Sequence, residues 1–219
     1  MKKNKNGVAA IGLVILIFLV GIGLLVFMVI SKSTSNKKKD DFKSPDTSGT
    51  QAQGFIWRQT AAGWEAQEKA PDCPAQPILK APADLSKVTS VLYPGQKRGP
   101  ISYKPHGGLR FDSSSDNNIT VTAPMDGYII SGTRFIADGG TEIQYSFSIM
   151  NNCGITNLIG HLRELPANLQ KIVETFPEAT KSSASQNVNP PVYVKQGDVL
   201  ATKVGIIGDR NTFFDWGGI

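Results

Sequence analysis

The chain has 219 residues and a formal net charge of +5, which is enough for one domain of moderate size with accessory segments. Much of the positive charge lies in the first 43 residues, so it points to a membrane surface rather than to nucleic acid. Basic and aromatic residues are not interleaved in the way typical of nucleic-acid-binding proteins, and no nucleic-acid partner is expected.

The N-terminal segment has the composition of a membrane anchor. Residues 1–7 form a short basic leader, and Val8–Ile30 contains only apolar residues and glycine. A helix of roughly 20 such residues crosses the hydrocarbon core of a bilayer. A cleaved signal peptide would have a shorter apolar core, of about 7–15 residues, followed by a small-residue cleavage site. Because neither feature fits, we predict an uncleaved transmembrane helix over residues 8–30.

The topology of this anchor follows from two opposing signals. Lysines lie on both sides of the apolar span, and a strict count of Lys and Arg slightly favours an outside N-terminus. The first span, however, often dominates topology and holds a short basic leader inside. We therefore expect a single-pass protein of the cell membrane, with the lipid bilayer as a partner and the downstream domain on the extracytoplasmic side.

Two segments connect the anchor to the domain. Residues 31–54 are predicted to be a flexible linker, since Ser44–Gln53 is polar and has no apolar period. Residues 55–95 are a lead-in segment with Trp57 and Trp64, broken up by prolines. Its aromatic side chains either cover an edge of the following domain or stack on sugar rings of a ligand. We favour the first interpretation.

Residues 96–219 are predicted to form one mostly β domain with a single helix, over Leu165–Phe176, where apolar residues share one stripe. Lys181–Asn189 is predicted to be a polar loop. Alternating and β-branched patterns predict strands over Ser90–Tyr93, Ile119–Ile130 (two strands), Thr141–Met150, Ile155–Leu162 and a hairpin of Val192–Val194 with Val199–Val204. Many short strands with one helix favour a sandwich or a barrel.

The two cysteines, Cys73 and Cys153, do not have metal-ligand spacing. They are either two separate buried thiols or one disulfide that ties the lead-in to the middle of the domain. A disulfide would require a compartment outside the reducing cytosol. The sequence leaves both alternatives open.

Three segments carry the two histidines and the last aromatic residues: Tyr103–Asp112, Ile159–Leu162 and Asn211–Gly217. Together with Ala123–Ile129 and Val194–Leu200, their order and spacing resemble the lysostaphin-type (LytM-like) zinc endopeptidases that cut peptidoglycan cross-bridges. The resemblance covers about residues 96–216. It implies a lysostaphin-like domain, that is, a β-barrel-sandwich with a duplicated hybrid motif, acting outside the cytoplasm.

The resemblance also implies a degenerate metal site. In that family a loop His and Asp and the last His of a His-x-His strand hold zinc, and two further histidines handle protons and the oxyanion. Here His106 matches the first ligand and His161 matches a non-ligand histidine, but the Asp position falls on Arg110 and the last pair on Asn211 and Phe213. A permanent cation such as Arg cannot coordinate a metal.

We therefore expect no zinc or other cofactor, and no hydrolysis of peptide bonds. The domain is expected to bind or scaffold at the cell envelope, with peptidoglycan or another envelope component as partner. Arg110 is expected to point into the former metal position, close to Asp112 or Asp215. The residues expected to converge on a ligand-binding groove are Tyr103, His106, Arg110, His161, Asp215 and Trp216.

Two alternatives remain open. In an active zinc endopeptidase with unusual ligands, His106, Asp112 and Asp215 would hold the metal and His161 would be the catalytic histidine. Such an oxygen-rich site suits zinc poorly. In the second alternative the domain is a hybrid barrel like that of membrane-fusion adaptor proteins. That interpretation is weaker, because an adaptor needs long flanking coiled-coil helices and no heptad run is present.

Overall fold

The computed structural model describes residues 54–75, 79–98, 100, 102–113, 117–182, 184–207 and 212–218. The predicted leader, the transmembrane helix over 8–30, the linker up to residue 53 and Asn211 lie outside these ranges. Within them, no helix has the length and apolar character needed to cross a membrane.

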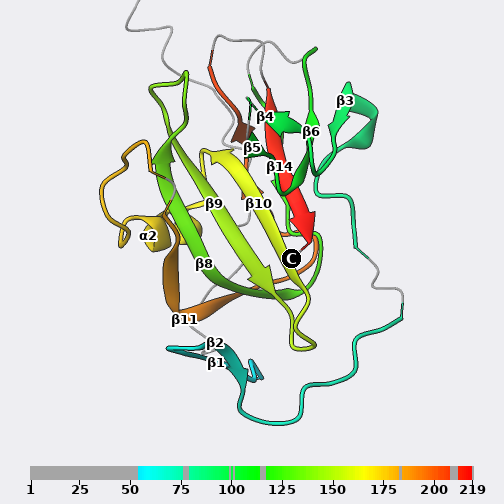
Figure 1. Cartoon of the computed structure of the whole chain (residues 1–219), viewed down its shortest axis with the longest axis vertical. Helices are drawn as coiled ribbons and strands as arrows, with labels where there is room; N and C mark the ends of the chain where they lie inside the picture. Colours follow the sequence, from blue (N-terminus) through cyan, green and yellow to red (C-terminus); the bar gives the residue numbers. More distant parts are fainter. Residues whose placement is uncertain are drawn as a thin grey trace, which may run out of the picture. The chain divides into compact units, whose positions relative to one another are not determined.

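The described part of the chain is mostly β, as predicted (Figure 1). Its main sheet has eight strands in the order β11-β8-β9-β10-β14-β6-β3, with β13 paired to β10. Three two-stranded sheets accompany it: β1-β2, β7-β12 and β4-β5. The strands are β1 Trp57–Thr60, β2 Gly63–Ala66, β3 Ser90–Leu92, β4 Lys97–Arg98, β5 Ser102–Tyr103, β6 Gly107–Arg110, β7 Val121–Thr122, β8 Gly127–Ile136, β9 Ile143–Met150, β10 Thr156–Arg163, β11 Gln186–Val194, β12 Val199–Ala201, β13 Lys203–Val204 and β14 Phe213–Gly218.

One α-helix, α2 (Ala167–Val173), lies in the described ranges, together with a short 3-10 helix, η1 (Leu85–Lys87). The predicted apolar stripe of α2 faces the core, with Leu169 and Val173 each 1% exposed. Helix α2 is shorter than the predicted Leu165–Phe176. Pro166 acts as its N-cap, because the missing N–H of proline is tolerated at a helix start.

The core lies between the inner face of the main sheet and a cover formed by β7, β12 and α2. Alternation along β9 decides which side chains enter it: Tyr145, Phe147 and Ile149 point inward, and the residues between them point to the outer face. Apolar side chains of the cover complete this core, namely Val121, Leu169, Val173, Leu200 and Ala201. Ser146 and Ser148, which alternate with the inward-pointing residues of β9, lie on the opposite, outer face of the main sheet.

The predicted C-terminal hairpin is wrong. Strand β11, which includes the predicted strand Val192–Val194, begins at Gln186, within the segment predicted to be a loop. It pairs with β8. Strand β12 instead pairs with β7, and β13 pairs with β10. Strand β11 forms one edge of the main sheet and buries few of its side chains, so many of its residues are polar. The apolar alternation typical of a strand is therefore missing from its sequence.

The lead-in segment is part of the domain rather than a separate spacer. Phe55, Trp57 and Trp64 of the β1–β2 hairpin pack on Tyr128 and Met150 at one end of the outer sheet face. The Phe55 and Tyr128 rings lie 4.5 Å apart. This contact favours the structural interpretation of the aromatic residues over sugar stacking.

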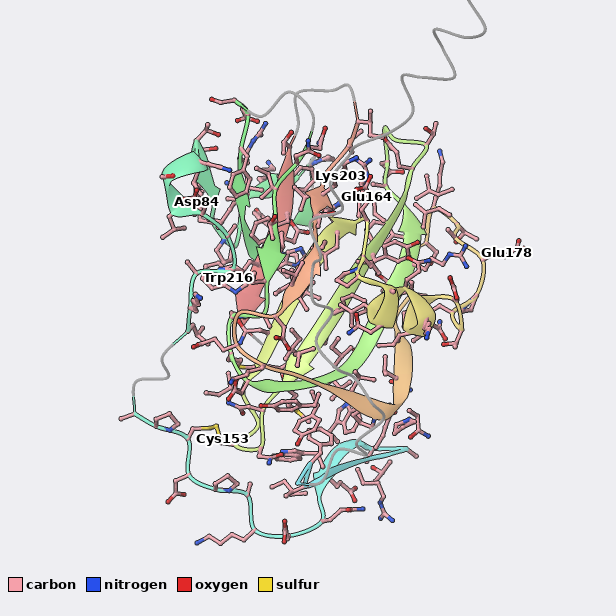
Figure 2. The ribbon with its side chains drawn as sticks, turned by 180° about the vertical axis from the view of Figure 1, so that it is seen from behind. Asp84, Cys153, Glu164, Glu178, Lys203 and Trp216 are labelled. Carbon is pink, nitrogen blue, oxygen red and sulfur yellow. A yellow bond between two sulfur atoms is a disulfide. The ribbon has the colours of Figure 1, made fainter. Side chains whose placement is uncertain are left out.

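A disulfide holds the same region. Cys73 is bonded to Cys153, with the two Cα atoms 5.1 Å apart, so the alternative of two separate thiols is wrong (Figure 2). Further along the lead-in, Ser90–Leu92 adds β3 to the edge of the main sheet beside β6. The lead-in therefore contacts the domain at the hairpin, at the disulfide and at the sheet edge.

Candidate functional site

The outer face of the main sheet is hollowed into a groove of about 560 Å³. Its floor consists of small residues from neighbouring strands, including Gly132, Ser146, Ser148 and Gly160. A Cβ at Gly160 would be in ordinary van der Waals contact with the Cβ of Asp215, 3.4 Å away, so the glycine keeps the floor low without being sterically required. Small side chains on the floor thus leave both the space above the sheet and the room for one buried carboxylate.

A cluster of charged and titratable side chains lies at the end of this groove. Asp215 of β14 faces the groove, because it alternates with Phe214, which enters the core. Its Oδ1 accepts a hydrogen bond from the Lys104 Nζ. Its Oδ2 lies 2.6 Å from the His106 Nε2 and 3.4 Å from the His161 Nε2. Lys104 is only 1% exposed and Asp215 only 6%, so water contributes little to either charge.

The electrostatics of the cluster favour an ionised carboxylate. Burial alone would raise the pKa of Asp215, but its contacts with His106, His161 and Lys104 outweigh burial and hold the pKa well below its usual range. The Lys104 ammonium also lies 5.6 Å from the centre of the Phe213 ring. A buried charge is tolerated only when it is paired and hydrogen-bonded, and these contacts meet that condition.

His161 reaches the groove through a β-bulge. Ile159 pairs with Phe147 and Leu162 with Tyr145, so β10 has one more residue than β9 between these pairs. The extra residue gives His161 a φ of 60°, which is rare outside glycine and asparagine. Such backbone geometry persists only where the surrounding structure enforces it, and it occurs preferentially at functional sites.

Gln144 fixes the orientation of this imidazole. Its side-chain N–H donates to the Gly205 carbonyl, which leaves its Oε1 2.6 Å from the His161 Nδ1. Because Oε1 accepts only, the Nδ1 carries a hydrogen, and the Nε2 is the atom presented to Asp215. The bulge and Gln144 together aim one defined nitrogen of His161 into the groove.

The structure brings together three of the six residues expected to converge. His106, His161 and Asp215 line the groove, but Tyr103, Arg110 and Trp216 do not. Tyr103 is 62% exposed in the β4–β5 hairpin. Trp216 points to the opposite face of β14, where it packs on the core and its indole N–H donates to Asn157 (Figure 2). Period-2 alternation separates Trp216 from Asp215, so adjacent residues of one strand cannot share the groove.

Arg110 lies close to Asp112, which is one of its two expected partners. Its Nη2 donates to the Asp112 Oδ1 at 2.8 Å, at the exposed edge beside Thr89. The cation that contacts Asp215 is instead Lys104. Asp112 therefore does not join His106 and Asp215, and the ligand set of the endopeptidase alternative is not assembled.

The residues present do not fit a zinc ion. No group of three or more potential ligands arranged for a metal occurs among the described residues. More directly, the Lys104 ammonium already occupies one oxygen of Asp215, and a second cation beside it would be repelled. His106 directs its Nε2 at the other oxygen of the same carboxylate. A metal would have to displace all of these contacts.

Sequence reasoning missed two members of the cluster. Lys104 precedes His106 by two residues, and lysines are almost never fully buried unless they are paired. Gln144 lies on a predicted strand at a polar, outward position, and nothing in the alternation distinguishes it from a solvated residue. The only sequence signal for Lys104 was its position two residues before one of just two histidines, and Gln144 had none.

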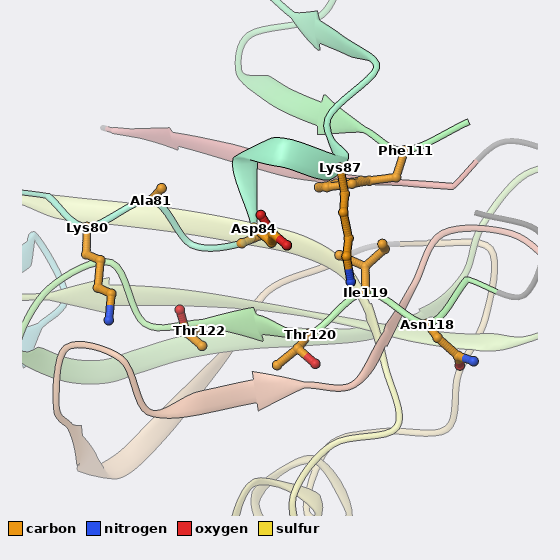
Figure 3. Close-up of a pocket in the computed structure, with 10 residues that line it drawn as sticks. Lys80, Ala81, Asp84, Lys87, Phe111, Asn118, Ile119, Thr120 and Thr122 are labelled. Carbon is orange, nitrogen blue, oxygen red and sulfur yellow. The ribbon is translucent and has the colours of Figure 1, made fainter. Parts of the chain in front are cut away.

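A second cavity, of about 370 Å³, lies between the lead-in and β7 (Figure 3). Lys80 and Lys87 enter it from the lead-in, and Thr120 and Thr122 from the opposite side. It shares no lining residue with the groove. Asp84 caps η1 by accepting a hydrogen bond from the Ser86 N–H, and its negative charge partly offsets the positive charges of the two lysines. Unlike the groove, this cavity is lined by neither a histidine nor a buried ion pair.

A scan against models of known protein families gave no match, and comparisons with curated proteins and with solved structures gave none either. Function is therefore inferred from the geometry of the groove and its cluster.

Proposed function

We infer that this chain is a membrane-anchored, non-catalytic binding domain of the cell envelope, built on a lysostaphin-like fold with a duplicated hybrid motif. Its ligand lies in the groove on the outer face of the main sheet. A buried Lys104–Asp215 ion pair takes the place of a catalytic metal. The assignment to the lysostaphin-type family rests on the sequence resemblance.

The observation that carries this proposal is the contact between Lys104 and Asp215. A catalytic zinc needs several protein ligands and one open position for water. At the end of this groove the buried carboxylate of Asp215 already contacts one ammonium and two imidazoles. The cluster thus keeps the charge balance that a metal would provide, and it has no open position at which water is activated.

The disulfide supports an extracytoplasmic location. Structural disulfides form and persist in oxidising compartments and are rare in the cytosol. Cys73 and Cys153 lie in the segment that follows the predicted anchor and in the β9–β10 connection. An N-terminal anchor with its basic leader inside would put both cysteines on the oxidising side of the cell membrane.

The lining of the groove favours an extended peptide of the cell wall as ligand. Hydroxyl groups from Thr133, Ser146 and Ser148 lie along it, and Lys181 and Asp138 supply one charge of each sign. Hydroxyls, imidazoles and single charges provide both donors and acceptors, as a backbone of alternating amide N–H and carbonyl groups requires. Peptidoglycan stem peptides and cross-bridges have this chemistry.

Sedimentation with purified insoluble peptidoglycan tests the proposal, using the full-length protein in detergent. We expect wild-type protein to sediment, and Ser148→Phe to lose most of this retention by filling the groove floor. The matched control is Thr120→Phe, which places the same ring in the second cavity and should sediment like wild type. Equal retention of both variants would put the ligand elsewhere.

Release of new amino groups from the same cell wall tests the endopeptidase alternative. The proposed function predicts no release, with or without added zinc. Release that disappears on chelation and returns with zinc would replace this proposal by an active metalloendopeptidase.

A further inference from the structure

The Lys104–Asp215 pair has the geometry of a reactive pair as well as that of an ion pair. The amine of Lys104 is in hydrogen-bond contact with the carboxylate of Asp215, and both side chains are more than nine-tenths buried. Neither residue lies on a free loop. Asp215 is in β14, and the Lys104 backbone is bonded on both sides, from its N–H to the Gln96 carbonyl and from the Gly95 N–H to its own carbonyl.

Rigid contact of this kind gives an intramolecular amine a very high effective concentration at the carboxyl carbon, equivalent to about 10⁵ M or more in well-oriented cases. Exclusion of water acts in the same direction, because it removes the competing hydrolysis of the product. We propose that Lys104 and Asp215 condense to an intramolecular isopeptide bond. The inference goes beyond the proposed function and does not depend on it, because the amide would occupy the same position as the ion pair and would likewise leave Asp215 without a carboxylate for a metal.

The reaction is balanced without any external reagent. A proton first passes from the Lys104 ammonium to the Asp215 carboxylate, which gives a neutral amine and a carboxylic acid. The Lys104 Nζ then attacks the Asp215 Cγ, the Nζ–Cγ bond forms, and the bond from Cγ to one carboxyl oxygen breaks. Of the three ammonium protons, one remains on the amide nitrogen and two leave with the released oxygen as water. No electron is transferred, and the net charge does not change, because an ion pair becomes a neutral amide.

The two histidines occupy the positions that this reaction needs. His106 Nε2 lies 2.6 Å from the Asp215 Oδ2, where an N–H stabilises negative charge on the oxygen as the tetrahedral intermediate forms. His161 Nε2 lies 3.4 Å from the same oxygen, with its other nitrogen held by Gln144. Proton transfer by a positioned imidazole is commonly worth a factor of about 10²–10⁴ in rate.

The surroundings favour the amide over the separated charges. The Phe213 ring packs beside the Lys104 ammonium, and Asp215 and Lys104 have almost no access to solvent. Two buried charges carry a large desolvation penalty that their attraction only partly repays, and conversion to an amide removes it. The resulting bond would link β14 to the segment before β6, across 111 residues of sequence.

The test is the intact mass of the full-length protein after reduction of its disulfide. The expected mass is lower than that of the sequence by one water, and proteolysis should give a branched peptide that joins Lys104 to Asp215. Lys104→Arg keeps a cation at the position but cannot form the amide, so it should have the full mass. His106→Gln should slow the loss of water in freshly synthesised protein.

A wild-type mass equal to that of the sequence, after prolonged incubation at neutral pH, would overturn the inference and leave an ion pair only. A loss of water that persists in Lys104→Arg would overturn it as well, because the dehydration would then lie elsewhere. Neither result affects sedimentation with peptidoglycan, so this proposal and the binding function can fail separately.

Discussion

The two ends of the outer sheet face are held in opposite ways. At one end, Tyr128 and Met150 are covered by the aromatic β1–β2 hairpin, with a disulfide nearby. At the other end the same strands carry a groove, and its buried contacts are an ion pair with two imidazoles. The first end is what a stable domain requires. Apolar burial and a cross-link both stabilise the fold directly.

The polar end is not explained by stability. A buried ion pair is often no better than a pair of apolar side chains of similar size. We therefore relate the cluster of Lys104, Asp215 and two histidines at the end of the groove to the proposed binding function. His161 supports this interpretation, because its positive φ is a strained conformation that apolar packing does not need.

The largest expected effect comes from removing one member of the ion pair. Asp215→Ala leaves the Lys104 ammonium buried and unpaired, which should lower the free energy of unfolding by about 3–5 kcal/mol. Urea unfolding followed by tryptophan fluorescence measures it. The double variant Lys104→Met with Asp215→Leu should recover most of the loss. If the double variant is as unstable as the single one, the polar end is a stability element and the comparison fails.

At the apolar end, Cys73→Ser with Cys153→Ser should lower the unfolding free energy by about 2–4 kcal/mol. The reason is that the bond closes a loop with a sequence separation of 80 residues in the unfolded chain. Retention on peptidoglycan should not change, since the disulfide lies outside the groove. An unchanged unfolding midpoint would show that the disulfide does not constrain the unfolded state as described.

The two ends should also differ in acid. In the ion-paired form, in which no amide has formed, the pKa of Asp215 is depressed in the folded state. Its contribution to stability is then present above the pKa of the unfolded chain and is lost as the pH falls below about 5. Asp215→Asn should reduce the slope of stability against pH in this range. The double cysteine variant should keep the wild-type slope. A slope that Asp215→Asn leaves unchanged would assign the acid sensitivity to other carboxylates.

The smallest effect is expected for Trp57→Phe. The ring stays in contact with the hairpin cluster, and only the hydrogen bond from the indole N–H to the Asn152 carbonyl, 3.1 Å long, is lost. Loss of one such bond should lower the unfolding free energy by about 1 kcal/mol. A much larger loss would mean that the indole shape, rather than apolar contact in general, fixes the hairpin.

Much of the fold was predictable because alternation encodes which strand residues face the core. The pattern of Thr141–Met150 located β9, and the stripe of Leu169 and Val173 located α2. Prediction failed for β11, which lies at a sheet edge and buries few residues. The pairing of β12 with β7 was also missed, because pairing depends on contacts between distant segments rather than on local pattern.

The site was predictable only in part. His106 and His161 stood out because histidine is rare in the chain, and strand alternation linked Asp215 to the position of Phe213. All four residues line the groove. The same alternation should have excluded Trp216. Arg110 was expected at the former metal position, close to Asp112 or Asp215. It lies close to Asp112 at the sheet edge, and the cation at Asp215 is Lys104, which the sequence analysis did not consider. No local pattern distinguishes which of two basic residues will be buried.

Zinc binding by the full-length protein is the most direct test of the central claim, that the Lys104 ammonium takes the place of a metal at Asp215. Equilibrium dialysis against zinc at neutral pH, with metal content measured per chain, gives the stoichiometry. The account predicts that wild-type protein binds far less than one zinc per chain and that Lys104→Ala binds more than wild type. One tightly bound zinc per wild-type chain, lost in His106→Ala, would contradict it.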